Sequence, residues 1–422
     1  MKKSKAVKLI GFLFVMAALA LCAFSVNSFY QEMQAEIADW QSTTWFVFSN
    51  DLESFDNAEY VTREEIEGYE TTTDVYNQGV YFSKLNDNEK LIYKAYQYAL
   101  DNNYMYTYVD ESMLNDGDLS AMDIIVLLSL DSAIVQQNLS TVEYSSNHTI
   151  YTRIYGKEVY KEVEGYIVSA ETFSEKRIEK VNDAIKELER VDFKFEAGAT
   201  QAEKAKIIFE YVEDNVDYFT ESNDKGGTGK GDVMSVITGA QDYLHSAVFK
   251  GVTNCDGFAN MYSLLCQMNG ITCFEKVSVP VEGEAGHTWN CVNIDGEWYN
   301  VDCTESVYEE DEDTAVYEML QFGFPDSLGY EKTHYASITP ACAKNLMPVD
   351  GEFSSCNDSG ISSKMSGYIR NSDDEIATVV IRSFDKDDFE DVVQNIANSL
   401  QADVYYVIDE RESCYICCVY KQ

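Results

Sequence analysis

Residues 253–270 read TNCDGFANMYSLLCQMNG, and this stretch decides the fold class that we predict. Asn254 is a good N-cap residue, and Asn269-Gly270 is a typical helix end. Between them, apolar side chains recur at the spacing of a single helix face, namely Phe258, Met261, Tyr262, Leu265 and Cys266. The stretch therefore predicts a buried helix that begins at Cys255.

The position of Cys255 at a helix N-terminus has chemical consequences. Backbone N–H groups without a helical partner, together with the helix dipole, favour the thiolate, which is the nucleophilic form of cysteine. The same N–H groups can hold an oxyanion. Cys266 lies on the apolar face instead and is predicted to be an ordinary buried thiol. Cys255 is thus the candidate nucleophile.

A predicted hairpin brings a histidine and an aspartate together downstream. Thr288–Ile294 and Glu297–Cys303 flank an Asp-Gly dipeptide at 295–296, which favours a two-residue type I′ turn. Counting outward from that turn places His287 and Asp302 on the same face, as diagonal neighbours. Such neighbours lie roughly 7 to 8 Å apart at the backbone, so their side chains can reach one another.

Cys255, His287 and Asp302 supply the nucleophile, the base and the group that orients the base in covalent catalysis. His334 is a second histidine that could line the same cleft. We prefer His287 because it alone follows from the hairpin register. The alternative for His287 is a purely structural role.

Three segments resemble the motifs of the bacterial transglutaminase-like superfamily: NCDGFA at 254–259, GHTWN at 286–290 and WYNVD at 298–302. The resemblance is strong over residues 250–304, weaker back to about 200 and absent elsewhere. It implies an α+β, papain-like core, in which a helix bearing the cysteine packs on an antiparallel sheet bearing the histidine and the aspartate.

The resemblance also implies roles: Cys255 as nucleophile, His287 as base and acid, and Asp302 as the orienting carboxylate. The tryptophan-rich context that follows the cysteine in calcium-dependent animal transglutaminases is missing here. Calcium activation is therefore not implied.

The first residues predict export. Four lysines precede Leu9–Val26, whose only non-hydrophobic members are Gly11 and Ser25. Because this segment approaches the length that spans a bilayer, a cleaved signal peptide and an uncleaved membrane anchor both stay open, as does lipidation at Cys22. We expect a bacterial, extracytoplasmic protein, secreted or anchored, that contacts the membrane only through residues 9–26.

Periodicity divides the remaining chain. Helical spacing over Leu91–Leu100 and Met122–Ile134 predicts a helical N-terminal region, and two amphipathic helices are predicted over 174–191 and 202–216. Near the C-terminus, a strand, a helix and two strands are predicted, at 376–381, 387–400, 404–408 and 415–420. The predicted domains are a signal peptide or anchor at 1–28, a helical N-terminal region at 30–165, a transglutaminase-like catalytic domain at 166–348 and a small α/β C-terminal module at 360–422.

Charge and motif spacing exclude several ligand classes. The formal net charge of -42 opposes nucleic acid binding. The acidic run 309–313 lacks EF-hand spacing, Gly226–Gly231 lacks the phosphate-loop pattern, and the CxxC at 414–417 has no second ligand pair. We expect no nucleic acid, no cofactor and no metal.

Together these features predict an exported cysteine acyl-transfer enzyme that acts on peptide or carboxamide substrates through a thioester. The expected partner is a peptide, a protein or a cell-wall amide. Transfer to water and transfer to an amine both stay open, with hydrolysis favoured because an amine acceptor needs a water-excluding passage. The alternative is a catalytically weak cell-surface binding or scaffold protein that retains the fold.

Overall fold

The structure is a computed structural model of the chain. The predicted export segment lies outside its described part except for residues 24–26, and so do Gly226–Gly231 and the acidic run 309–313. Within the described part, no helix combines the length and the apolar character needed to cross a membrane. The described residues are 24–43, 45–50, 58–71, 76–104, 106–110, 113–114, 119–133, 135, 141–170, 175–219, 243–278, 286–304, 321–328, 333–346, 349–372, 375–411 and 414–421.

The chain divides into two compact units by its internal contacts. The first comprises Met1–Thr71, Asp87–Ile124 and Thr141–Glu171, and the second comprises Thr72–Asn86, Ile125–Ser140 and Thr172–Gln422. Two short pieces from the N-terminal half thus belong to the unit that carries the candidate site.

The first unit contains a five-stranded sheet in the order β2-β1-β3-β5-β4. Its strands are β1 (Trp45–Ser49), β2 (Glu59–Thr62), β3 (Tyr106–Asp110), β4 (Thr141–Ile154) and β5 (Lys157–Ala170). The helices are α2 (Arg63–Glu67), α3 (Asp87–Asp101) and the start of α4 (Ala121–Asp131).

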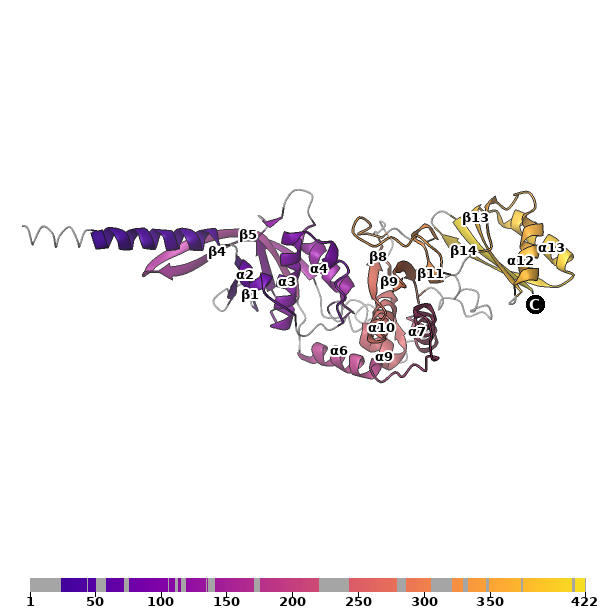
Figure 1. The fold of residues 1–422 in the computed structure, drawn as a ribbon, viewed down its shortest axis with the longest axis horizontal. Coiled ribbons are helices and arrows are strands. Elements are labelled where there is room, and N and C mark those ends of the chain that lie inside the picture. The colour runs from indigo at the N-terminus through magenta and orange to yellow at the C-terminus, as the bar shows by residue number, and fades with distance from the viewer. Residues whose placement is uncertain are drawn as a thin grey trace, which may run out of the picture. The chain divides into compact units, whose positions relative to one another are not determined.

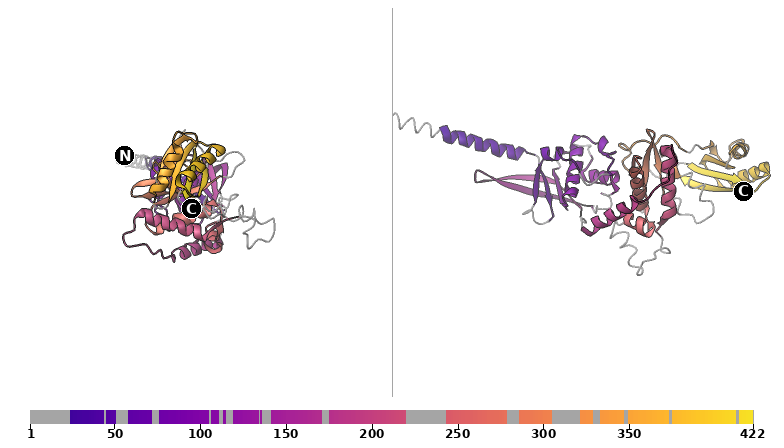
Figure 2. Two further views of the ribbon diagram at one scale, coloured as in Figure 1. Left: turned by 90° about the vertical axis from the view of Figure 1, so that its right-hand side faces the viewer. Right: turned by 60° about the horizontal axis from the view of Figure 1, so that its bottom comes forward.

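The two helices predicted in this region are present as α3 and α4, but the region is not purely helical as predicted. Polar residues occupy both faces of much of β4 and β5, so the sequence lacks the alternation of apolar and polar residues that indicates a strand. In Figure 2 these two strands form a long hairpin beside the helix over residues 24–42. Ile37 of that helix is buried with Ile154 and Val159 of the hairpin.

The second unit is built on a four-stranded antiparallel sheet in the order β11-β10-β9-β8. Helix α10 lies against β8 and β9 (Figure 1). The strands are β8 (Cys273–Val277), β9 (Thr288–Ile294), β10 (Glu297–Val301) and β11 (Phe322–Phe324), and the helices are α6 (Glu175–Leu188), α7 (Gln201–Asn215), α9 (Tyr243–Lys250) and α10 (Cys255–Met268). A two-stranded parallel pair, β6 (Asp217–Tyr218) and β7 (Val252–Thr253), precedes α10. This is the expected α+β core.

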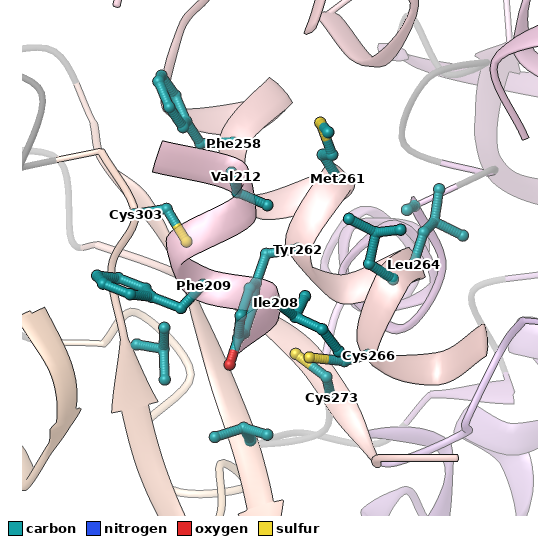
Figure 3. Packing of buried hydrophobic residues seen from close by; sticks show 14 of the residues in the cluster. Ile208, Phe209, Val212, Phe258, Met261, Tyr262, Leu264, Cys266, Cys273 and Cys303 are labelled. Carbon is teal, nitrogen blue, oxygen red and sulfur yellow. The ribbon is translucent and has the colours of Figure 1, made fainter. Parts of the chain in front are cut away.

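The predicted apolar helix faces form the core of this unit. Figure 3 shows side chains of α7 and α10 packed together, including Phe209 and Tyr262, and both rings are fully buried. All five predicted apolar positions of α10 are buried. Each such side chain contributes roughly 1.5 to 3 kcal/mol when it leaves water. This packing fixes the helix that carries Cys255.

The predicted hairpin is confirmed in its turn and its register. Asp295 and Gly296 both have positive φ, 53° and 90°, as a type I′ turn requires. Strand pairing runs outward from Glu297 opposite Ile294 to Val301 opposite Asn290. Any slip by one residue would turn His287 away from Asp302.

The C-terminal part holds a second four-stranded sheet, in the order β12-β13-β15-β14, with two helices packed on it (Figures 1 and 2). The four predicted elements are present as β13 (Ile376–Ser383), α13 (Lys386–Leu400), β14 (Val404–Arg411) and β15 (Cys414–Lys421). The module begins earlier than predicted, because its first strand is β12 (Gly351–Ser355). Helix α12 (Ile361–Asn371) connects β12 to β13, and the two strands pair in parallel. The CxxC cysteines, Cys414 and Cys417, are buried in β15.

Candidate active site

Cys255 occupies the first position of α10. Its N-cap, Asn254, is extended (φ −103°, ψ −174°), and the Asn254 side chain accepts a hydrogen bond from the backbone N–H of Gly257 at 3.3 Å. Gly257 is needed because a Cβ there would lie 2.0 Å from Oγ1 of Thr253. Cys255 is half-buried, whereas the other nine cysteines in the described part of the chain are buried. It is therefore the best placed of these thiols to meet a substrate.

His287 and Asp302 are in direct contact, with 2.6 Å between Nε2 and Oδ2. The histidine side chain is 16% exposed and the carboxylate 2%. Ser278 holds the His287 backbone at both ends, since its Oγ accepts from the His287 N–H and its own N–H donates to the His287 carbonyl. The second Asp302 oxygen accepts from the N–H of Thr304 at 2.9 Å. The imidazole is thus oriented by a carboxylate that is itself fixed.

The charge state of His287 follows from these contacts. Burial lowers the pKa of His287, but the Asp302 carboxylate and the Cys255 sulfur more than offset this and raise it to about 12. Cys255 lies within hydrogen-bonding reach of the imidazole. Because Asp302 takes Nε2, Nδ1 is the nitrogen available to Cys255. The site therefore favours an imidazolium beside the sulfur.

Trp289 covers one face of the imidazole, with ring centroids 5.9 Å apart and an angle of 16° between the planes. Its indole N–H donates to Oδ1 of Asn300 at 3.1 Å. The same Asn300 oxygen accepts from the ammonium of Lys276 at 2.8 Å, and that ammonium also lies 3.0 Å from Asp326. A buried polar network thus holds the ring that shields His287.

The network residues Lys276, Asn300 and Asp326 were not predicted from the sequence. Lys276 is 1% exposed, and burial lowers its pKa, but Cys291, Cys342 and Asp326 together raise it above its ordinary value. The available signal was a pair of adjacent charged residues, Glu275 and Lys276, within the short strand 273–277. A charged residue in such a place requires a partner.

His334 does not share the contacts of His287. Its backbone N–H donates to the carbonyl of Val277. Its exposed ring lies edge-on to the ring of Tyr335, with 4.6 Å between the ring centroids. The carboxylate contact that orients an imidazole is made by His287.

Within the described ranges, no group of three or more His, Cys, Asp or Glu side chains is arranged to hold a metal ion. The chemistry available to the described site is that of a thiol, an imidazole and a carboxylate. This set supports nucleophilic attack on a carbonyl and proton transfer to a leaving amine.

Residues 191–303 match the family model of the transglutaminase-like superfamily. The matched range includes Cys255, His287 and Asp302. Kyphoscoliosis peptidase of Mus musculus is 35% identical over 65 residues, and that of Homo sapiens is 32% identical over 62 residues. Each match covers 12% of this chain and 9% of the relative, so the chain spans under a tenth of their length.

Solved structures with some similarity include a protein described as a TGase, at 16% identity and a TM-score of 0.25, covering 40% of this chain and 46% of that one. Another is a candidate protease from Parabacteroides distasonis, at 10% identity and a TM-score of 0.21, covering 68% and 64%. The match over residues 191–303 shows that the chain contains a domain of the transglutaminase-like superfamily.

Proposed function

We propose that this domain catalyses acyl transfer from a peptide or carboxamide carbonyl through a thioester on Cys255. One observation carries the proposal: the helix-start thiol lies beside an imidazole that is fixed by a carboxylate at 2.6 Å. The known role of such a carboxylate is to orient the imidazole and stabilise its charged form.

The first half-reaction transfers the acyl group to the enzyme. The Cys255 sulfur attacks the carbonyl carbon, and the oxyanion is held by backbone N–H groups at the start of α10 that precede Gly257, whose own N–H is bonded to Asn254. The C–N bond breaks, and the His287 imidazolium gives its proton to the departing amine. A thioester on Cys255 and a neutral His287 remain.

The second half-reaction releases the acyl group. His287 takes a proton from the acceptor, which attacks the thioester carbonyl, and the sulfur leaves as a thiolate. We propose water as the main acceptor, since an amine must compete with water at roughly 55 M and needs a water-excluding passage to succeed. Trp289 stacks on the imidazole of His287 and is therefore not available to form a wall of such a passage. Hydrolysis of a peptide or of a cell-wall amide is the reaction that fits best.

We also propose that the chain works outside the cytoplasm. This rests on the four lysines followed by the apolar segment Leu9–Val26. Mass spectrometry of the native N-terminus, combined with cell fractionation, tests the proposal. A cytosolic protein that still begins at Met1 contradicts it.

The reaction is tested by incubating the full chain with a peptide library that contains glutamine and a labelled primary amine, and then reading products by mass. We expect cleavage or deamidation to exceed amine incorporation, and Cys255→Ser to abolish both. Dominant amine incorporation contradicts the hydrolytic preference. An absence of turnover in every channel, with wild-type Cys255 inert to alkylation, contradicts the enzyme and favours a binding or scaffold role.

A further inference from the structure

A single hydrogen bond connects the immediate neighbours of the nucleophile and the base. Thr288 follows His287, Asp256 follows Cys255, and Oγ1 of Thr288 donates to Oδ1 of Asp256 at 2.8 Å. The bond therefore spans from the start of β9 to the first turn of α10.

The Asp256 carboxylate is also tied to the cap of the helix. Its Oδ2 accepts from the side-chain amide of Asn254 at 3.2 Å, and Asn254 in turn accepts from the N–H of Gly257. Burial raises the pKa of Asp256, although the hydrogen bonds from Thr288 and Asn254 and the charge of His287 act to lower it. Holding a carboxylate there costs free energy.

Two further contacts continue the same seam between helix and sheet. Asn290, two residues beyond Thr288 on the same face of β9, donates to the carbonyl of Ala259 at 2.9 Å. Asn260 on α10 donates to the carboxylate of Glu275 on β8 at 3.2 Å. These two contacts hold the helix as a body, whereas the bond from Thr288 holds its reactive end.

We infer that the hydrogen bond between Thr288 and Asp256 sets the separation of Cys255 from His287, which makes both of its partners positioning residues. This inference rests on the proposed function, because the separation matters only if the two groups act together. A displacement near 1 Å in a reactive pair costs roughly 100-fold in rate. The bond joins the first residue of β9 to the residue that follows the nucleophile.

The test uses iodoacetamide, which reports on the Cys255 sulfur without any substrate. The full chain and its Thr288→Val and Thr288→Ser variants are alkylated from pH 5 to 9, and the label on Cys255 is counted by peptide mass. The groups whose charge acts on His287 are Asp302 and Cys255, and the Asp256 carboxylate in turn interacts with the charge of His287. The pH dependence of alkylation therefore depends on these few groups.

We expect Thr288→Val to slow alkylation of Cys255 at pH 6.5 by roughly tenfold, because the sulfur loses its imidazolium neighbour. Thr288→Ser, which keeps the hydroxyl, is expected to stay within about threefold of the wild type. Ser263→Ala removes another buried hydroxyl of α10, one that donates to the carbonyl of Cys273 at 3.4 Å, and is expected to leave the profile unchanged.

If Thr288→Val does not fold, the pair Asp256→Asn and Asp256→Leu answers the same question, since the amide keeps an oxygen that can accept from Thr288. The inference is overturned if the wild type and the variant that lacks the bond show equal alkylation profiles. It is also overturned if Ser263→Ala slows alkylation of Cys255 as much as that variant does. A shifted profile in a chain that turns over no substrate supports the positioning role and contradicts the proposed reaction instead.

Discussion

Nε2 of His287 and Oδ2 of Asp302 lie 2.6 Å apart, although one residue precedes the first strand of a hairpin, the other follows the second strand, and they are fifteen positions apart in sequence. The hairpin register places them on one face, and a buried carboxylate is held by the Thr304 N–H.

Asp302→Asn is expected to reduce turnover by roughly 100-fold or more while the protein still folds. The amide keeps the size of the side chain but cannot balance an imidazolium and can favour the wrong tautomer of His287. Steady-state kinetics, with circular dichroism as the check on folding, measure this. The orienting role is contradicted if the variant unfolds and its loss of activity equals the fraction of unfolded protein.

The stabilisation from the contact between His287 and Asp302 is expected to depend on pH. The folded-state pKa of about 12 lies above the ordinary value of 6.5, so the imidazolium is the stabilised form. Its contribution is complete below pH 6.5 and is lost as pH rises toward 12. The difference in unfolding free energy between the wild type and Asp302→Asn should shrink steadily from pH 7 to pH 10. A difference that is constant or grows over this range is inconsistent with the charge assignment.

Gly257→Ala is expected to destabilise the protein by roughly 2 kcal/mol and to lower activity, because a Cβ would lie 2.0 Å from Oγ1 of Thr253 and push the first turn of α10 away. Gly367→Ala is the matched control. Gly367 lies inside α12, and a Cβ there meets nothing within 4 Å. It should gain roughly 1 kcal/mol with activity unchanged. Thermal melts and turnover assays of both variants show whether tight packing or helix propensity determines the effect of an alanine at position 257. Similar effects of the two substitutions would refute the explanation by packing.

Lys276→Met is expected to destabilise the protein by roughly 2 kcal/mol, since Asn300 and the half-exposed Asp326 lose a buried ammonium. Activity should fall further, because Asn300 also holds Trp289. Lys344→Met removes an ion pair with Glu297 whose side chains are 61% and 51% exposed, and it should change stability by no more than roughly 0.5 kcal/mol. Equal effects of the two substitutions on denaturant unfolding would show that the network does not support the site.

Local patterns in the sequence predicted the parts of the site that local physics determines. The helix starting at Cys255 follows from a cap, a periodic apolar face and an ending Asn-Gly, and the hairpin follows from one turn dipeptide. The register then determined that His287 and Asp302 share a face. Each of these elements carries its own signal within about twenty residues.

Contacts between distant positions were missed. Lys276 meets Asn300 and Asp326 across 24 and 50 residues, and no local period indicates such partners. The five-stranded N-terminal sheet was also missed, because β1 and β3 are short and pair across about sixty positions. Strand β12 lies before the predicted module at 360–422, and helix α12 lies inside it but was not predicted as an element, since glycine and serine interrupt the apolar pattern of both.

Trapping of the acyl-enzyme tests the central claim most directly. The folded chain is mixed with p-nitrophenyl acetate, an acyl donor that does not depend on the natural substrate, quenched in acid and mapped by mass. The account predicts one acetyl group on Cys255 that hydroxylamine removes, as expected for a thioester, and none at this position in Cys255→Ser. Folded wild-type protein that carries no acetyl group on Cys255, while the reagent acylates other side chains, would contradict it.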